Sequence, residues 1–184
     1  MIDLDQVNNS LKRKFKDRKL IFGSGDATAK IVFVCETPGE DEEREGRPLA
    51  GPREKLLNQL LVKLGVNKKK VYITNVVKYM PRNKVLTSKE IKSYVPFLRE
   101  EIKMINPDII VTLGNMALTG IGLRQPLDNV HGRIFNLGSH ELFPTFHPAH
   151  ALKDPQIKTL MESDFALLKN LIAIKTAAKK NNTA

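Results

Sequence analysis

Four short runs of apolar and β-branched residues constrain the fold of this chain more than any other feature. They lie at 30–36, 71–77, 108–113 and 141–146. The first reads KIVFVCE and is too continuous for a strand with one face in water, so it predicts a buried parallel strand. Helical patterns separate the runs, and strands that alternate with helices join by crossovers into a mainly parallel sheet covered on both faces. The predicted fold class is therefore α/β.

Apolar residues spaced three and four apart predict the helices around these strands. We expect helices over 2–19, 53–64, 89–105, 114–121 and 157–178, and one further strand over 131–137. The first helix, within the segment 1–20, has a basic outer face. Residues 37–52 are expected to form a polar loop rich in glycine and proline. The polar tail 179–184 is expected to be frayed.

Length and composition limit the class of protein. A chain of 184 residues fits a single domain spanning 1–184. The single cysteine, Cys35, excludes an intramolecular disulfide framework and any cysteine-rich zinc or iron–sulfur site. No apolar run approaches the ~18–20 residues of a membrane span. The polar, acidic N-terminus excludes a secretory signal peptide. We therefore expect a soluble monomer in the cytoplasm with no membrane partner.

The chain is basic, with 30 Lys and Arg against 20 Asp and Glu, a formal net charge of +10 and a pI near 9.7. This balance suggests a polyanionic partner such as nucleic acid. A solvated basic surface explains the charge equally well. Six of the cations crowd one short segment: Lys12, Arg13, Lys14, Lys16, Arg18 and Lys19.

Ligands of parallel α/β sheets bind at the carboxyl ends of the strands, where Glu36, Thr37, Asn75 and His147 are expected to meet. A buried asparagine needs hydrogen-bond partners, so Asn75 is either structural or pairs with a nucleobase edge, since one carboxamide matches adjacent N–H and C=O groups. His147 either packs the end of its strand or works at this rim. His147 and His150 could form a pair of metal ligands, but no third ligand is near, so no metal is expected.

The segment 35–51, CETPGEDEEREGRPLAG, has neither the GKS or GKT ending of a P-loop nor a GxGxxG pattern, which disfavours a nucleotide-phosphate cradle. We interpret Asp41, Glu42 and Glu43 as an acidic surface. No serine lies in a G-x-S-x-G elbow and Cys35 lies inside an apolar strand, so covalent nucleophilic catalysis has little support.

Three segments, in their order and spacing, resemble the uracil-DNA glycosylase superfamily, most closely its family 4. They are ETPGEDEEREGRPLAG (36–51), TNVVKYMPRNK (74–84) and TFHPAHALKD (145–154), and NPDIIVTLGNMAL (106–118) matches the connecting strand and helix. The resemblance spans about 22–154. It implies a three-layer α/β/α fold around a mainly parallel four-stranded sheet. It also implies a DNA glycosylase of base excision repair that flips uracil out of DNA and hydrolyses its N-glycosidic bond.

The resemblance also implies roles for individual residues. Asn75 matches the asparagine that pairs with uracil, and His147 matches the histidine that stabilises the departing uracil anion. Glu36 and Thr37 take the positions beside the base and the attacking water. Leu49 takes the position of a phenylalanine that stacks on the base. The positions expected to contact DNA, with Leu152 on the loop that wedges into the duplex, are Pro38, Gly39, His150, Leu152 and Lys153.

Two departures from the family pattern qualify this prediction. Family 4 holds a [4Fe–4S] cluster on four cysteines, but two of those positions are Tyr79 and Tyr94 here, and residues 8–18 contain no cysteine. A cluster needs thiolates, so no cofactor is expected. Leu49 also lacks the aromatic face that is worth ~1–3 kcal/mol per stacked base. The alternatives are a glycosylase for another deaminated base, hypoxanthine or xanthine, and a non-catalytic relative that binds DNA or lesions. While it acts on DNA, the protein is expected to associate with the nucleoid.

Overall fold

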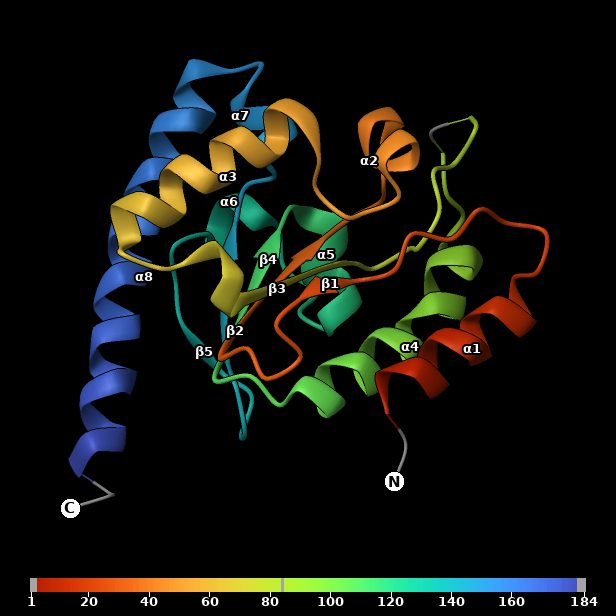
Figure 1. The fold of residues 1–184 in the computed structure, drawn as a ribbon. Helices are drawn as coiled ribbons and strands as arrows, with labels where there is room; N and C mark the ends of the chain where they lie inside the picture. The colour runs from red at the N-terminus through yellow and green to blue at the C-terminus, as the bar shows by residue number, and fades with distance from the viewer. Residues whose placement is uncertain (1–2, 84, 182–184) are drawn as a thin grey trace.

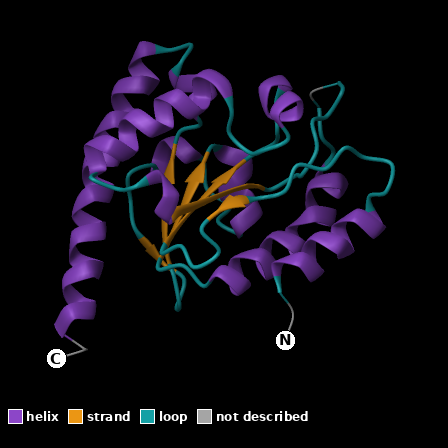
Figure 2. Cartoon of the chain, viewed as in Figure 1, coloured by secondary structure: helices purple, strands orange, loops and turns teal. Residues whose placement is uncertain are grey.

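The structure is a computed structural model that describes residues 3–83 and 85–181 (Figure 1). Residues 1–2 of the first predicted helix and residues 182–184 of the predicted frayed tail lie outside the described residues. Strands gather in the middle of the molecule and helices cover them on both sides (Figure 2). The predicted α/β class is therefore confirmed.

The sheet has six strands in the order β1-β3-β2-β4-β6-β5. Its four central strands are parallel and match the four predicted runs: β2 (Ile31–Cys35), β3 (Val71–Asn75), β4 (Ile109–Leu113) and β6 (Glu141–Thr145). Every residue of β2, β3 and β4 is buried, as expected for a sheet covered on both faces. The apolar runs thus form the centre of the sheet.

Both edges of the sheet correct the expectation of four strands. A two-residue strand, β1 (Ser24–Gly25), pairs antiparallel with β3, and another, β5 (Phe135–Asn136), pairs antiparallel with β6. The strand predicted over 131–137 shrinks to β5, because Gly132 adopts a left-handed conformation with φ +69° and turns the chain before it. Such short edge strands leave little exposed backbone for other chains to pair with.

The helices form two layers. One contains α1, α4 and α5, and the other contains α3, α7 and α8 (Figure 1). Their bounds, with the short helices and the 3₁₀ helix η1, are α1 (Leu4–Lys14), α2 (Glu40–Glu45), α3 (Gly51–Leu64), η1 (Lys68–Lys70), α4 (Ser88–Ile105), α5 (Asn115–Ile121), α6 (Leu127–Val130), α7 (Pro148–Ala151) and α8 (Pro155–Asn181). Within the described residues, no helix is both long enough and apolar enough to cross a membrane.

Three of the predicted helix and loop boundaries are wrong. Helix α1 ends at Lys14 rather than at residue 19, because Phe15 leaves the helical conformation and its ring stacks on Tyr94. The predicted loop over 37–52 contains α2, whose first turn Glu42 closes through its side chain. Helix α8 continues to Asn181, so the predicted frayed tail is helical over 179–181.

A buried ion pair fastens α4 to the chain that leaves β3. The Lys78 ammonium lies 2.6 Å from the Glu101 carboxylate, and both side chains are almost fully buried. Tyr72 and Thr74, both on β3, donate hydroxyl hydrogen bonds of 2.9 to 3.0 Å to the same carboxylate. Breaking a buried pair leaves an uncompensated charge, so each partner depends on the other.

We expect Glu101→Ala to lower the free energy of unfolding by about 3–5 kcal/mol, because it leaves the Lys78 ammonium buried without its carboxylate partner. The double variant Lys78→Met/Glu101→Leu removes both charges and should recover most of that loss. Urea unfolding of the two variants measures the effect, with Glu100→Ala as the neighbouring control. A Glu101→Ala loss no larger than that of Glu100→Ala would show that the pair does not hold α4.

Candidate active site

The parallel strands bring the predicted site residues to one edge of the sheet. Cys35, the last residue of β2, lies opposite Asn75, the last residue of β3, and the backbone pairing continues as Val77 N–H donates to the Glu36 carbonyl at 3.1 Å. On the other side, Gly114 N–H after β4 donates to the carbonyl of Thr145 at the end of β6. The chain therefore exits all four strands at one level, as the sequence predicts.

A cavity of about 530 Å³ opens at this edge. Its walls come from the segment after β2, from α3, from the segment after β3 and from the loop around α7. The lining residues are Glu36, Thr37, Pro38, Gly39, Glu40, Asp41, Arg53, Met80, Pro81, His150 and Lys153. Six of the predicted site residues thus share one wall, because Glu36, Thr37, Pro38 and Gly39 are joined there by His150 and Lys153.

The first turn of α5 fixes the position of the Glu36 side chain. Its Oε1 accepts the Met116 N–H at 3.0 Å. Burial raises the pKa of this carboxyl above its usual value, while the Met116 hydrogen bond and the charge of His150 oppose that rise. Gly114 has φ +101°, and a Cβ there would stand 2.3 Å from Oε1. Only glycine therefore lets Glu36 lie in this position.

Glu42 supports the site in a way that the sequence interpretation misses. The composition of its segment predicts an acidic surface, but its side chain is buried. Its carboxylate accepts the Gly39 N–H at 2.8 Å and the Ala50 N–H at 3.0 Å, and it lies 3.1 Å from the Arg53 guanidinium. Glu42 therefore joins α2 to α3 and shapes the cavity wall. The signal in the sequence is the Gly39-x-x-Glu42 spacing, which suits a side chain that reaches back to cap its own helix.

Asn75 lies behind the cavity wall, with only 1% of its surface exposed. Its Nδ2 is one of three buried side-chain polar atoms that have no hydrogen-bond partner among the described residues; the others are Tyr94 Oη and Thr112 Oγ1. An unpaired buried amide donor costs about 1–3 kcal/mol. Buried polar groups are otherwise paired, so this one indicates either strain or a ligand that completes it.

His147 is the N-cap of α7 and is buried. Its Nδ1 accepts the Ala149 N–H at 3.0 Å, which leaves the proton of the neutral ring on Nε2. Burial first, then the charges of Arg53 and His150, lower the pKa of His147 to about 3. The imidazole is therefore neutral at physiological pH and can act as an Nε2–H donor.

The two leucines of the predicted site lie in different surroundings. Leu49 is buried in the core and is absent from the cavity wall, and its backbone has φ +52°, a left-handed conformation that is rare for a residue with a branched side chain. Strained backbone of this kind gathers at functional sites. Leu152 is 47% exposed at the end of α7. It stands free beside the cavity residue Lys153.

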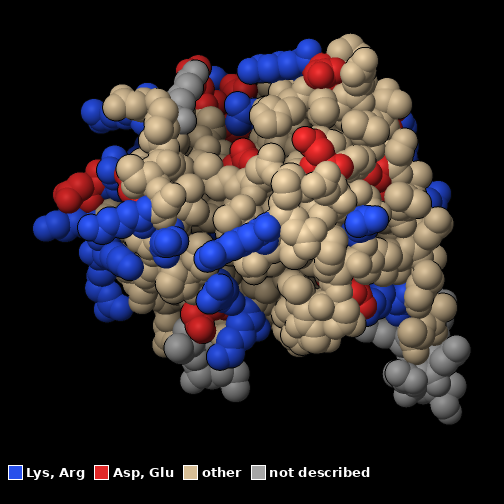
Figure 3. Space-filling view, turned by 180° about the vertical axis from the view of Figure 1, so that it is seen from behind, with Lys and Arg blue, Asp and Glu red and all other residues tan. Residues whose placement is uncertain are grey.

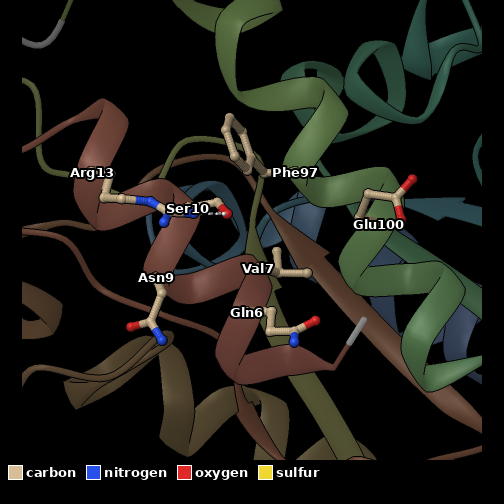
Figure 4. Close-up of a pocket in the computed structure, with 7 residues that line it drawn as sticks. All are labelled: Gln6, Val7, Asn9, Ser10, Arg13, Phe97 and Glu100. Atoms are coloured by element: carbon tan, nitrogen blue, oxygen red, sulfur yellow. Dashed lines mark hydrogen bonds between the residues drawn. The ribbon is translucent and has the colours of Figure 1, made fainter. Parts of the chain in front are cut away.

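A separate groove, outside the candidate active site, lies between α1 and α4 (Figure 4). Arg13 and Phe97 face each other across it, and Arg13 donates a 3.1 Å hydrogen bond to Ser10 of its own helix. None of the predicted site residues lines this groove. No group of three or more His, Cys, Asp or Glu side chains in the described part of the chain could hold a metal ion.

Comparison with known proteins agrees with this geometry. The family model described as "Uracil DNA glycosylase superfamily" matches residues 22–169, and the chain belongs to that superfamily. It is similar to the type-4 uracil-DNA glycosylase of Saccharolobus solfataricus, with 36% identity over 96% of this chain and 88% of the relative. The type-4 enzymes of Sulfurisphaera tokodaii and Thermotoga maritima are 38% and 36% identical; the matches cover 81% and 83% of this chain, and 73% and 83% of those relatives.

The iron–sulfur cluster that the resemblance to family 4 implies does not fit these residues. Such a cluster needs thiolate ligands. The only cysteine, Cys35, is buried in β2, and burial raises the pKa of its thiol well above the usual value. Tyr79 and Tyr94, which stand at two of the ligand positions, lie in ring contact at 5.9 Å. An aromatic cluster occupies this region.

Two side chains from the segment after α1 complete that aromatic cluster. The Phe15 ring stacks on Tyr94 with centroids 4.0 Å apart and planes 8° from parallel. The Arg18 guanidinium lies 4.4 Å from the centre of the Tyr79 ring, a cation–π arrangement. Packing of these side chains therefore joins the N-terminal segment to the body of the protein.

We expect Tyr94→Ala to lower the free energy of unfolding by about 3–5 kcal/mol, because it removes the central ring of the aromatic cluster. Tyr94→Phe keeps the ring and deletes a buried hydroxyl without a hydrogen-bond partner, so its stability should equal or exceed that of the wild type. Urea unfolding compares the two variants. Iron and inorganic sulfide are also measured in anaerobically purified protein. Stoichiometric iron with sulfide would contradict an aromatic cluster in place of an iron–sulfur cluster.

The low pKa of His147 predicts a pH dependence of stability. In the unfolded chain the imidazole titrates near pH 6.5, whereas in the folded protein its pKa is about 3. Between those values only the unfolded chain takes up the proton, so the stability that His147 contributes is complete above about pH 6.5. It is lost as the pH falls, by up to about 1.4 kcal/mol per pH unit.

Urea unfolding between pH 4 and 7 measures this effect as the difference between the wild type and His147→Asn, which keeps a side chain suited to the N-cap. We expect the wild type to lose stability relative to the variant as the pH falls. Asn129→Ala, at an exposed position of α6, changes no titratable group and is the control; it should run parallel to the wild type. If the curve of His147→Asn also ran parallel to that of the wild type, the pKa of His147 in the folded protein would be close to its ordinary value.

Proposed function

We propose that this protein is a DNA glycosylase that removes uracil from DNA by hydrolysing its N-glycosidic bond. The observation that carries the proposal is the buried Asn75 carboxamide at the carboxyl edge of the sheet, with an Nδ2 donor that no described residue satisfies. One carboxamide can accept from the N3–H of uracil and donate to the adjacent O4 carbonyl. Membership of the superfamily and the names of the type-4 relatives support the same activity.

A base inside a duplex is out of reach, so the enzyme must flip the nucleotide into its pocket. In our proposal Asn75 reads the base edge and Leu49 borders it. Leu152 is the exposed apolar side chain that fills the gap left in the duplex. Pro38, Gly39 and the cationic side chain of the cavity wall, Lys153, lie along the flanking backbone together with His150.

Hydrolysis adds water across the bond between uracil N1 and the sugar C1′. The water oxygen bonds to C1′, the C1′–N1 bond breaks with its electron pair going to the base, and uracil leaves as an anion that later takes up a proton. Glu36 and Thr37 orient the water, and Glu36 accepts its proton. The neutral His147 donates its Nε2–H hydrogen bond to the negative charge that develops on the base, as the donors of an oxyanion hole do.

None of these steps needs a cofactor. We propose that the protein acts as a monomer with a single domain, a proposal supported by the fact that all proposed residues lie in one chain. It works where uracil arises in DNA, in the cytoplasm at the nucleoid.

Asn75→Asp tests the proposal. The carboxylate cannot donate to O4 and repels it, so single-turnover release of uracil should fall on the order of 10–100-fold, the value of one bidentate base contact. Oligonucleotides with uracil, hypoxanthine or xanthine are incubated with enzyme and cleaved with alkali at abasic sites. Asn129→Asp, on the exposed side of α6, is the matched control and should release uracil as the wild type does.

The outcomes separate the alternatives. Equal uracil release by the wild type and a folded Asn75→Asp, checked by its melting curve, would remove Asn75 from base recognition. If Asn75→Asp does not fold, Asn75→Ala takes its place. Release of hypoxanthine or xanthine, without release of uracil, would show that the substrate is another deaminated base. DNA binding by the wild type without release of any base would make it a non-catalytic relative.

A further inference from the structure

Three hollows lie in series from the candidate active site to the C-terminal end of α1. The active-site cavity shares Met80 with a second groove of about 540 Å³, and that groove shares Arg18 with a third of about 210 Å³. Hollows that share a wall residue are adjacent. The surface is therefore channelled from the proposed uracil pocket to the basic segment that follows α1.

Five Lys and Arg side chains line the second and third of these hollows, and we call them the basic track. They are Lys12, Lys16, Arg18, Lys19 and Arg82. The third groove carries no carboxylate, whereas Asp17 and Glu43 line the second, so the end nearest α1 attracts anions most strongly. Seen from behind, Lys and Arg gather on the side of the molecule that holds α1 (Figure 3).

The cations of the basic track are available to a ligand. Within the described residues, Arg18 alone of the five has a carboxylate within ion-pair distance, Glu90 at 3.9 Å. Lys12 lies 5.4 Å from the centre of the half-buried Phe22 ring, and the side chains of Lys16 and Lys19 are exposed. Aromatic faces beside cations suit a nucleic-acid strand, because bases stack on rings while phosphates meet the charges.

The basic track is also held at a fixed position relative to the site. The Phe15–Tyr94 stack and the Arg18–Tyr79 contact clamp the segment after α1, and Ile21 N–H donates to the Lys78 carbonyl at 2.6 Å. Lys78 follows Asn75 by three residues on the same segment. A strand bound along the track would therefore enter the site in a defined register.

We propose that the basic track binds the sugar–phosphate backbone of single-stranded DNA flanking the flipped nucleotide. The inference rests on the proposed function for the identity of the strand, and on the grooves and their charges for its path. Phosphate contacts of this kind position a protein on DNA without reading sequence. They also make affinity depend on salt, with a slope of about −0.7 per phosphate contacted in single strands.

The triple variant Lys16→Ala/Lys19→Ala/Arg82→Ala tests the basic track. The matched control Lys69→Ala/Lys103→Ala/Lys169→Ala removes the same charge from exposed positions on η1, α4 and α8. Affinity for uracil-containing single strands with flanks of increasing length is measured between 0.05 and 0.3 M salt. Uracil release by the wild type is measured in parallel on the same strands.

We expect the track variant to bind long strands on the order of 10–100-fold more weakly at 0.1 M salt, and its salt slope to fall by about 2. The wild type and the control should gain affinity as the flank lengthens, whereas the track variant should gain little. If the track variant does not fold as the wild type does in its melting curve, the single variants Lys16→Ala and Lys19→Ala replace it, each with a slope change of about 0.7.

Equal affinities and slopes for the track and control variants would overturn the proposal. So would a track variant that keeps its affinity for DNA but loses binding to vesicles of anionic phospholipid, since the track would then serve a membrane surface. Absence of uracil release by the wild type would instead refute the proposed function, and the salt slopes would still decide whether the track binds DNA.

Discussion

The pairing of β2 with a parallel strand on each side is the constraint on which the rest of the molecule depends. Ile31–Cys35 pair with β3, residues 31–34 also pair with β4, and all five residues of β2 are buried. Because the pairing is parallel and in register, Glu36 leaves the sheet beside Val77 while Cys35 faces Asn75. A shift of this register would separate the Glu36 carboxylate from the Met116 N–H in the first turn of α5. The core therefore determines the geometry of the site.

The polar groups buried around this edge differ in whether all their polar atoms have hydrogen-bond or ion-pair partners. Glu42 accepts two backbone N–H groups and lies against Arg53, and the Lys78–Glu101 pair is joined by two hydroxyls. These groups are fully engaged, so their role is to fix the loops. The Asn75 amide has an unused donor. Tyr94 Oη and Thr112 Oγ1 also lack partners among the described residues, but of the three only Asn75 is the last residue of its strand at this edge, where a ligand could complete its hydrogen bonding.

Sequence patterns predict the centre of the fold well and its periphery poorly, for a physical reason. A strand buried on both faces needs a continuous apolar run, so β2 and β4 are evident in the sequence. The two-residue strands β1 and β5 follow from turns and edge pairing and leave no such run. The acidic composition of α2 suggested a surface loop, yet one of its carboxylates, Glu42, is buried, because the charge is neutralised by groups distant in the sequence.

The same contrast applies to the site. The strand ends predict that Glu36 and Thr37 meet Asn75 and His147 at one edge of the sheet, because parallel strands bring their carboxyl ends together. The depth of each side chain depends on packing, which no local pattern encodes. Asn75, His147 and Leu49 consequently lie behind the cavity wall rather than on it. The sequence predicts that these residues stand near the strand ends, but it does not predict how deeply each side chain is buried; their roles at the site stay predictions.

The aromatic cluster shows how a joint can be kept while its chemistry changes. A metal cluster ties two distant segments by covalent ligands, and its integrity depends on thiolates and redox conditions. Stacked rings tie Phe15 to Tyr94 by burial and dispersion, which need neither. Arg18 then serves two purposes, because the guanidinium that closes the stack over Tyr79 also lines the grooves leading to the proposed pocket. Rings and a cation thus hold the N-terminal segment in place, and the cation adds a positive charge beside the proposed path of the DNA.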